Sequence, residues 1–397
     1  MRIKLADRKY CNGCSSCAAI CPKAAISMIA DAEGFKYPNI DTTRCCGCNK
    51  CVATCPALNR LIPRTPMLVY AAKAIDDMVR LASSSGGVFP LLAKEIIGRG
   101  GTVFGAGWNK TWRVVHMAVD SEVGLSDIMG SKYVQSDVCN TYSEARCLLD
   151  KGQYVMFIGT PCQIAGLKAY LGKDYIKLLA VEIICHGVPS PLAWEKYLEQ
   201  RIKESLEDKT SSSQCSQSLG AQILRISSRN KKYGWKRYAL SVNFANKKVY
   251  LRDVQSDIYL RGFLAELYTR PSCHGCLCRE LRSGADITLG DYWGVDGRFP
   301  SFDDDKGVSL VLINTLKGMN LFESISCSIV KLESDYSHAC IVNPSLAKSV
   351  APHPRRNQFF RRIGFCEFDN LVTDLLKPSI TRRLLTIIGR TVRRVLK

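Results

Sequence analysis

The sequence predicts an α+β / α/β chain in two parts, a small module of cysteine-rich turns followed by a larger mixed α/β domain. Two observations carry this prediction. A duplicated run of cysteines fills the first 56 residues, and apolar strand segments alternate with helical segments from Thr141 onward. The 397 residues also exceed one small domain. We expect the module at residues 1–62, the larger domain at 63–345 with parts at 63–150 and 151–345, and a basic C-terminal tail at 346–397.

The N-terminal cysteines follow the pattern C-x-x-C-x-x-C-x-x-x-C-P twice. Thiolates at this spacing are soft ligands on tight turns, which suits a four-iron, four-sulfur (4Fe-4S) cluster. In such double runs the fourth cysteine of each run binds the cluster of the other run. The predicted ligands are Cys11, Cys14, Cys17 and Cys55 for cluster one, and Cys45, Cys48, Cys51 and Cys21 for cluster two.

This module resembles the two-cluster bacterial ferredoxins, because all eight ligands and the prolines that follow each run, Pro22 and Pro56, match. A disulfide framework would need an oxidising compartment, and a zinc site usually groups four ligands in two pairs, so both alternatives fit less well. Cys46 is left over as a neighbour that is not a ligand. With 20 cysteines and no apolar leader at the start, we expect a cytoplasmic protein whose thiols bind metal.

The chain is strongly basic, with 55 Lys and Arg against 36 Asp and Glu and a formal net charge of +19. This excess favours an acidic partner, an anionic cofactor or an anionic membrane surface. Bound clusters carry negative charge and would offset part of it. No zinc finger, helix-turn-helix or RNA-binding signature is present, so we expect no nucleic-acid partner. No apolar run reaches the roughly 18 to 20 residues of a membrane span.

A turn rich in serine and glycine precedes the first helix of the larger domain. After a strand expected at 67–74, Ser83 to Gly87 come directly before an amphipathic helix that ends at Gly98. Glycine lets the backbone approach a ligand, and helix N-terminal amides favour a phosphate or an electron-rich ring. A merely flexible loop fits these residues equally well. Further on, residues 222–253 alternate as in an antiparallel meander.

Cysteines follow two buried strands of the larger domain. Cys162 comes just after a strand expected at 153–159, and Cys185 just after one expected at 176–184. Strands adjacent in sequence are often adjacent in space, so the two thiols are expected to share a metal site. The alternative is that each is an isolated, small buried apolar residue.

A third cysteine group, C-x-x-C-x-C, occupies residues 273–278. It has too few thiols in standard geometry to hold a cluster alone, so further ligands must come from elsewhere in the chain. The thiols at the two strand ends meet that need. We predict a third 4Fe-4S cluster on Cys162, Cys185, Cys273 and Cys276, with Cys278 as the substitute for any one of them.

Five short motifs together resemble one known family. SSGG, GTPCQIAGL, CHGVPSP, CHGCLCR and ADITLGDYWG are similar to motifs of the beta-subunit family of the deazaflavin-dependent (coenzyme F420) hydrogenases and dehydrogenases, between about Val69 and Asn314. The resemblance implies a mixed α/β flavin-binding domain that holds FAD and an iron-sulfur cluster, fused here to the ferredoxin module. The flavin contacts that it implies are Ser85, Gly86, Gly87, Lys132, Tyr133, Ser136, Gly159, Thr160, Gln163 and Asp291.

We therefore expect an iron-sulfur flavoprotein oxidoreductase that passes electrons between a hydride carrier and 4Fe-4S clusters through FAD. The carrier would be a reduced deazaflavin or another small substrate, and the redox partner another protein or an external ferredoxin. The alternative is an electron-transfer subunit without its own substrate that serves a reductase or hydrogenase. A zinc-stabilised binder of an acidic partner is a third, weaker hypothesis. The candidate proton donors are His186, His274, Tyr133 and Asp291.

Residues 381–397 form a separate amphipathic pattern. Projected as a helix, Leu384 and Ile388 lie on one side and Arg390 and Arg394 on the other. This pattern is typical of a helix that lies on anionic lipid, which would place the protein at the inner face of the membrane. A helix docked on its own domain fits the pattern equally well.

Overall fold

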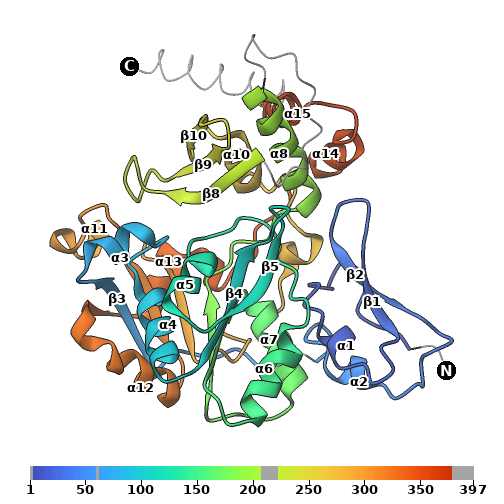
Figure 1. Cartoon of the computed structure of the whole chain (residues 1–397), viewed down its shortest axis with the longest axis horizontal. Coiled ribbons are helices and arrows are strands. Elements are labelled where there is room, and N and C mark those ends of the chain that lie inside the picture. The colour runs from blue at the N-terminus through green and yellow to red at the C-terminus, as the bar shows by residue number, and fades with distance from the viewer. Residues whose placement is uncertain (1–2, 60–61, 207–221, 378–397) are drawn as a thin grey trace, which may run out of the picture.

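The computed structural model describes residues 3–59, 62–206 and 222–377, so the helix expected at 381–397 lies outside the described residues. Figure 1 shows a large sheet with helices on both faces, a smaller layer above it and the N-terminal module beside it. The predicted fold, a ferredoxin-like module followed by a mixed α/β domain, is confirmed. Within the described ranges, no helix is both long enough and apolar enough to cross a bilayer.

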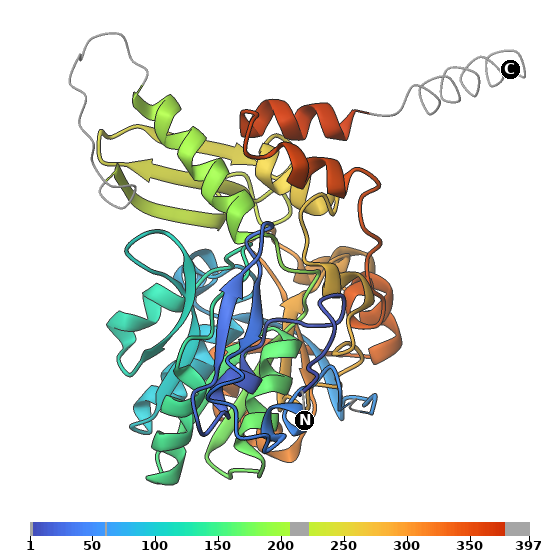
Figure 2. The same cartoon turned by 90° about the vertical axis from the view of Figure 1, so that its right-hand side faces the viewer.

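The N-terminal module combines two cysteine-rich turns with one antiparallel hairpin. Its elements are α1 (Ser16–Ala19), β1 (Ile26–Ala30), β2 (Lys36–Ile40) and α2 (Lys50–Ala53). The hairpin stands against the body of the protein and points toward the upper layer (Figure 2). At its tip, a Cβ on Gly34 would lie only 2.7 Å from the backbone nitrogen of Leu192, so the two backbones meet closely.

The large sheet is mixed, with the strand order β13-β3-β12-β11-β7-β6-β4-β5. Strands β4, β6, β7 and β11 run parallel to one another, and the other pairings are antiparallel. The strands are β3 (Leu68–Ala74), β4 (Thr102–Trp108), β5 (Val114–Val119), β6 (Val155–Gly159), β7 (Leu178–Ile183), β11 (Ile287–Asp291), β12 (Ser309–Ile313) and β13 (Ile329–Ser334). The four parallel strands share one carboxyl edge, the place where open α/β sheets bind ligands.

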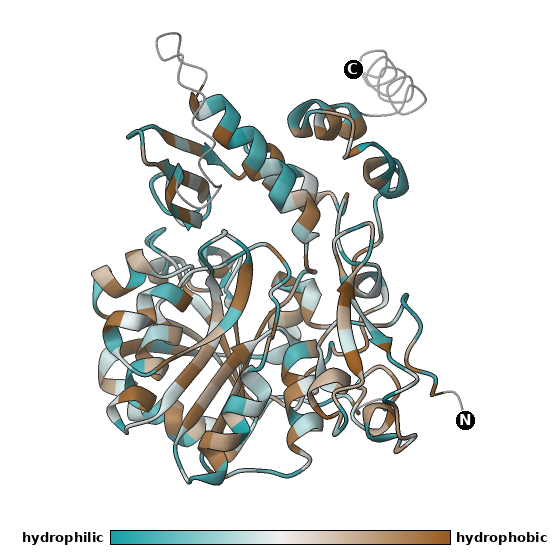
Figure 3. Cartoon of the chain, turned by 45° about the vertical axis from the view of Figure 1, so that its right-hand side comes forward, coloured by the Kyte–Doolittle hydropathy of each residue, from teal (hydrophilic) through white to brown (hydrophobic). Residues whose placement is uncertain are grey.

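Helices cover both faces of the large sheet. One face carries α4 (Val88–Gly98), α5 (Glu122–Ile128) and α12 (Leu316–Ser324), and the other carries α6 (Thr141–Asp150) and α7 (Pro161–Leu171). In Figure 3 the apolar residues follow the strands and the inward faces of these helices. Phe104 and Phe157 are fully buried there, and each such side chain contributes about 1.5–3 kcal/mol of burial.

The upper layer is a three-stranded antiparallel sheet with helices packed on it. Its strands β8 (Ile223–Asn230), β9 (Ala239–Phe244) and β10 (Val249–Asp253) form the predicted meander. Helices α8 (Pro191–Leu206), α10 (Ile258–Leu264), α14 (Arg356–Arg362) and α15 (Phe368–Leu376) share an apolar core with it. The helices α14 and α15, which lie in the range expected as a tail, therefore contribute to this layer. The short connecting elements are α3 (Asp77–Ala82), η1 (Pro271–Gly275), α11 (Val295–Arg298), η2 (Pro300–Phe302), η3 (Ser326–Ser328), α13 (Tyr336–Val342) and η4 (Pro344–Leu346).

Candidate functional site

The eight N-terminal ligand candidates line two separate cavities. The first thiol cavity is lined by Cys11, Cys14, Cys17 and Cys55, and the second by Cys21, Cys45, Cys48 and Cys51 together with Cys46. This is the crossed grouping expected from the sequence, in which each run lends its fourth cysteine to the other. The thiols surround hollows rather than converge on a point: among the described residues, no three His, Cys, Asp or Glu side chains could hold a single metal ion.

The same backbone turn shapes both cysteine runs. Gly13 and Gly47 have φ angles of 68° and 71°, and Ser15 and Asn49, two residues later, have φ angles of 64° and 57°. Glycine adopts this left-handed conformation without a steric penalty. The repeated turns wrap three cysteines of each run around a cavity. Burial raises the pKa of the Cys14 thiol well above its usual value, so a positively charged metal would be needed to hold it as thiolate.

Five thiols line a third cavity at the carboxyl edge of the large sheet. They belong to Cys162, Cys185, Cys273, Cys276 and Cys278, and their cavity is called here the third thiol cavity. Because β6 and β7 are parallel neighbours, Cys162 in the first turn of α7 and Cys185 after β7 meet at one edge. Since four thiols complete a cluster, the choice of Cys276 over Cys278 stays a prediction.

The thiols of Cys276 and Cys278 differ in their surroundings. A hydrogen bond from Cys278 lowers the pKa of Cys276 to about 6, which favours its thiolate. Cys278 is buried and accepts a hydrogen bond at 3.5 Å from the side-chain nitrogen of Asn12, in the ferredoxin module. Cys276 is therefore the readier ligand, and Cys278 lies on the side of the cavity that faces the module.

A larger cavity of about 490 Å³ lies next to the third thiol cavity, between the carboxyl edge of the sheet and the upper layer. Most of the flavin contacts expected from the family resemblance line it, namely Ser85, Gly87, Lys132, Tyr133, Ser136, Gly159, Thr160, Gln163 and Asp291. Gly86 does not line it. A Cβ on Gly86 would lie 2.5 Å from the carbonyl oxygen of Ala72. This glycine therefore allows the turn to pack closely against the sheet instead.

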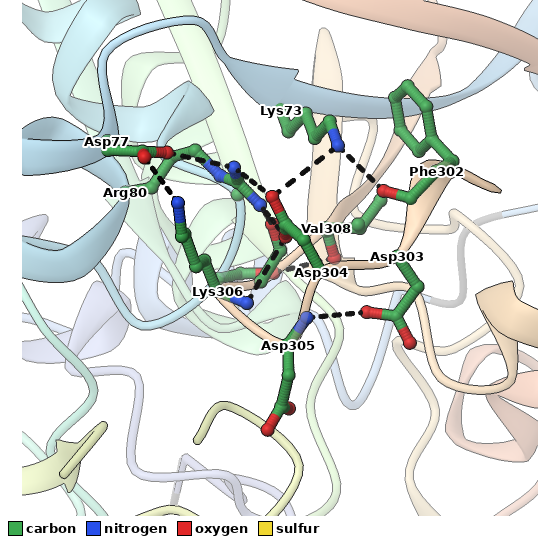
Figure 4. Close-up of polar contacts among 12 residues, drawn as sticks. Lys73, Asp77, Arg80, Phe302, Asp303, Asp304, Asp305, Lys306 and Val308 are labelled. Atoms are coloured by element: carbon green, nitrogen blue, oxygen red, sulfur yellow. Dashed lines mark hydrogen bonds and ion pairs between the residues drawn. The ribbon is translucent and has the colours of Figure 1, made fainter.

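Ion pairs and hydrogen bonds around the buried Arg80 hold the serine- and glycine-rich turn in place. Arg80 is only 3% exposed and pairs with Asp304, while its guanidinium also donates to the Gly307 carbonyl at 3.1 Å. Figure 4 shows Lys73 and Arg80 pointing toward Asp304 from two sides. Lys231 donates to the Ser85 carbonyl at 2.8 Å. The turn is therefore a fixed wall of the large cavity, which argues against the flexible-loop interpretation.

A network of hydrogen bonds connects residues that line one side of the large cavity. His116 donates from Nε2 to the Ile158 carbonyl at 3.1 Å, and its Nδ1 accepts from the Ser136 hydroxyl at 3.0 Å. Ser136 in turn accepts from the amide of Gln163 at 2.8 Å, and Gln163 accepts from the backbone nitrogen of Thr160 at 2.9 Å. This network fixes the N-terminus of α7, and with it the strand end that carries Cys162.

The network predicts a pH dependence of stability. Burial lowers the pKa of His116 to about 4, below the 6.5 of an exposed histidine. The unfolded chain therefore binds a proton first as the pH falls, and stability declines between pH 6.5 and 4. From pH 7 to 5 we expect a loss of about 2 kcal/mol, which is absent in the non-titrating variant His116→Gln. Urea unfolding under anaerobic conditions measures the free energy of unfolding of the wild type and of His116→Gln at each pH. If this free energy fell equally with pH in both proteins, His116 would not be the group responsible.

Arg229 is the most prominent wall residue that the sequence does not reveal. It is buried, donates to Asp291 at 3.0 Å and to the Ser84 carbonyl at 3.1 Å, and lies over the Tyr238 ring at 3.9 Å. It lies near the end of β8, the first strand of the meander, within a basic stretch that looks solvent-exposed in the sequence. His116 was missed for a similar reason, because a histidine in an alternating strand gives no signal of its partners. Neither residue belongs to a recognisable motif.

The candidate proton donors separate into two groups. His186, Tyr133 and Asp291 line the large cavity, and the Nε2 atom of His186 also contacts a carboxylate oxygen of the buried Glu266. His274 lines none of these cavities, and its Nδ1 lies 3.0 Å from the Val350 carbonyl. Lys132 lines the large cavity, but its amine donates to the Met129 carbonyl at 2.8 Å.

The cavities adjoin in a definite order. Cys162 and Cys185 line both the large cavity and the third thiol cavity. Asn12 lines both the third and the first thiol cavities. The module also touches α7 directly, since a Cβ on Gly166 would lie 3.1 Å from the Cys14 sulfur. The second thiol cavity is the outermost, and its Cys46 and Cys48 are exposed.

Two family models match the chain. Residues 152–335 match the model for the C terminus of the coenzyme F420 hydrogenase/dehydrogenase beta subunit, and residues 10–59 match the model for a 4Fe-4S dicluster domain. A comparison with curated proteins found no match. Among solved structures, the chain is similar to a chain of the F420-reducing nickel-iron hydrogenase complex from Methanosarcina barkeri. That similarity has 16% identity and a TM-score of 0.47, and it covers 72% of this chain and 90% of the other.

Proposed function

We propose that the chain is an iron-sulfur flavoprotein oxidoreductase. Residues 152–335 belong to the coenzyme F420 hydrogenase/dehydrogenase beta-subunit family, and residues 10–59 form a 4Fe-4S dicluster domain. In this proposal the large cavity holds FAD and each thiol cavity holds a 4Fe-4S cluster. The observation that carries it is the shared wall, because Cys162 and Cys185 line both the large cavity and the third thiol cavity. A redox group in the large cavity would therefore lie next to the ligands of the third cluster.

The large cavity fits a flavin in size and chemistry. Its volume of about 490 Å³ lies within the roughly 300–1,000 Å³ usual for cofactor sites. Tyr238 and Trp293 offer aromatic faces, the first turn of α7 offers backbone amides, and Arg229 offers a buried cation beside them. FAD, when bound, exchanges a hydride as a two-electron unit and passes electrons singly to the clusters.

The chain's own residues would hold and shield that group. Thr160 caps α7 with a capping box, so the amides of the first turn stay directed at the cavity. Asp291 accepts hydrogen bonds from both Arg229 and Trp235, which fixes the guanidinium in place. Phe263, contributed by α10, closes the cavity from the upper layer and limits the entry of water.

The outermost cluster is the proposed point of exchange with a protein partner. Lys23, Arg44 and Lys50 are exposed around the second thiol cavity, and none of them forms an ion pair with another described residue. A basic surface over an accessible redox centre favours an acidic one-electron carrier, such as an acidic ferredoxin.

Reversing this charge is expected to slow the exchange. The triple variant Lys23→Glu, Arg44→Glu and Lys50→Glu should reduce an acidic ferredoxin about tenfold more slowly at low salt, and high salt should narrow the difference. Three exposed lysines of the larger domain, Lys110, Lys151 and Lys247, provide the matched control. Stopped-flow absorbance measures the rate, with methyl viologen as a partner that needs no docking. Equal slowing by both triple variants would contradict the assignment of the exchange face.

The proposal is tested by turnover of the isolated chain. The protein is purified without oxygen, mixed with reduced coenzyme F420 or with NADH, and followed by loss of the visible absorbance of the clusters. Cluster reduction by one of these hydride donors supports the oxidoreductase. Reduction only after a partner protein is added would favour the alternative, an electron-transfer subunit without its own substrate.

A further inference from the structure

Arg270 is a buried cation at the junction of the ferredoxin module and the larger domain. Its side chain is 0% exposed. The guanidinium donates to the carbonyl oxygens of Cys11 and Lys36, each at 2.9 Å, and to the side-chain oxygen of Gln135 at 2.8 Å. It also lies over the Tyr37 ring at 4.4 Å. All of these partners are uncharged.

Arg279 has the same character on the other side of the third thiol cavity, whose wall it forms. It is 6% exposed and donates to the carbonyl oxygens of Cys185 and His186, each at 3.0 Å, and to that of Ser345. Its remaining bond goes to the hydroxyl of Ser349 at 3.2 Å. Arg279 too has no carboxylate partner among the described residues.

The other buried arginines of the described ranges are all paired with acids. They are Arg80 with Asp304, Arg201 with Asp369, Arg229 with Asp291, Arg282 with Glu280 and Arg356 with Glu33. A buried charge without a counter-charge costs several kcal/mol, so proteins rarely keep one. Of the two exceptions, Arg279 lines the third thiol cavity, and the backbone of Arg270 bonds to two residues of its wall, Val188 and Cys273. The Arg270 guanidinium also holds the Cys11 carbonyl at the first thiol cavity. The missing counter-charge therefore belongs to what these cavities bind.

We propose that Arg270 and Arg279 are the counter-charges of the iron-sulfur clusters at this junction and raise the reduction potentials of these clusters. Arg270 serves the first and third clusters together, and Arg279 serves the third alone. Taking up one electron adds one negative charge to a cluster and requires no proton, so a nearby fixed cation favours the reduced form. Both arginines are positioning residues that act through the clusters. The inference rests on the proposed function, because it requires that clusters fill the thiol cavities.

The test is a redox titration of the anaerobic holoprotein with dithionite and mediators, followed by low-temperature electron spin resonance. In Arg270→Gln, the first and third clusters should become about tenfold harder to reduce, or about 59 mV more negative for one electron. In Arg279→Gln, only the third should shift. The second cluster is the internal reference, and loss of its signal in Cys48→Ala assigns it. Arg270→Lys keeps the charge and should restore most of the potential.

Arg356→Gln is the matched structural control, because Arg356 is buried at the same interface but already paired with Glu33. It should leave all three potentials unchanged. Where Arg270→Gln loses iron, Gln135→Glu places a carboxylate beside the intact guanidinium and should shift the same two clusters. Unchanged potentials in the Arg270 and Arg279 variants would overturn the inference, and so would equal shifts of all three clusters. Iron analysis separates these results from failure of the proposed function, in which the clusters themselves are missing.

Discussion

Replacing Cys162 with alanine is expected to remove about four of about twelve iron atoms per chain and to isolate the large cavity from the ferredoxin module. Cys162 lies in the first turn of α7 and lines both the large cavity and the third thiol cavity. Its loss leaves the third cluster without one of the two predicted ligands that also line the large cavity. Cluster reduction by a hydride donor should then fall close to background, while direct reduction of the two module clusters by dithionite persists.

The matched control is Cys147→Ala, at an exposed cysteine of α6 that lines none of the cavities described above. It should keep its full iron content and its rate of reduction. Because Cys278 lines the third thiol cavity as a spare thiol, the double variant Cys162→Ala and Cys278→Ala guards against replacement of one ligand by the other. A double variant that keeps all its iron and its rate would contradict the role of this cavity.

Replacing Gly166 with alanine is expected to damage the contact between the ferredoxin module and the larger domain. In an ordinary helix interior, this change would stabilise the protein by about 1 kcal/mol. Here the added Cβ would lie 2.9 Å from the Tyr142 hydroxyl and 3.1 Å from the sulfur of Cys14. Overpacking of this kind costs about 1–3 kcal/mol, and Cys14 cannot move away without leaving the first thiol cavity. The clash should outweigh the helix propensity.

Two measurements follow the damage. Iron analysis should show loss of up to about four atoms from the first cluster, and anaerobic unfolding should show a net loss of about 1–2 kcal/mol. Gly98→Ala is the control, because Gly98 also lies in a helix, α4, and nothing lies within 4 Å of its added Cβ. If Gly166→Ala were as stable and as rich in iron as Gly98→Ala, the proposed docking of the module on α7 would be wrong.

The ligand candidates could be predicted because cluster chemistry imposes local spacing on the chain. The turn from Cys11 to Cys17 must bring three thiols to one side, and this fixes their separation in sequence. The convergence of Cys162 and Cys185 could also be predicted, since parallel neighbouring strands end at the same edge of a sheet. In these cases the structure groups the residues as the sequence led us to expect.

The rest of the site could not be predicted because it depends on contacts between distant segments. Arg229 reaches Asp291 only because the upper layer folds over the sheet edge, and its neighbours in sequence give no sign of this. Arg270 meets Cys11 across 259 positions of sequence. Gly86 was expected to contact the flavin, but its close packing against Ala72 depends on how the sheet folds and cannot be seen in the sequence.

The central claim is that three iron-sulfur clusters connect a bound flavin to the outer face of the module. The most direct test is the content of iron, acid-labile sulfide and flavin in protein purified without oxygen. The account predicts about twelve iron and about twelve sulfide per chain, in three four-iron clusters, together with about one FAD. About eight iron, with no change in Cys162→Ala, would contradict the third cluster, and a preparation without flavin would contradict the large cavity as its site.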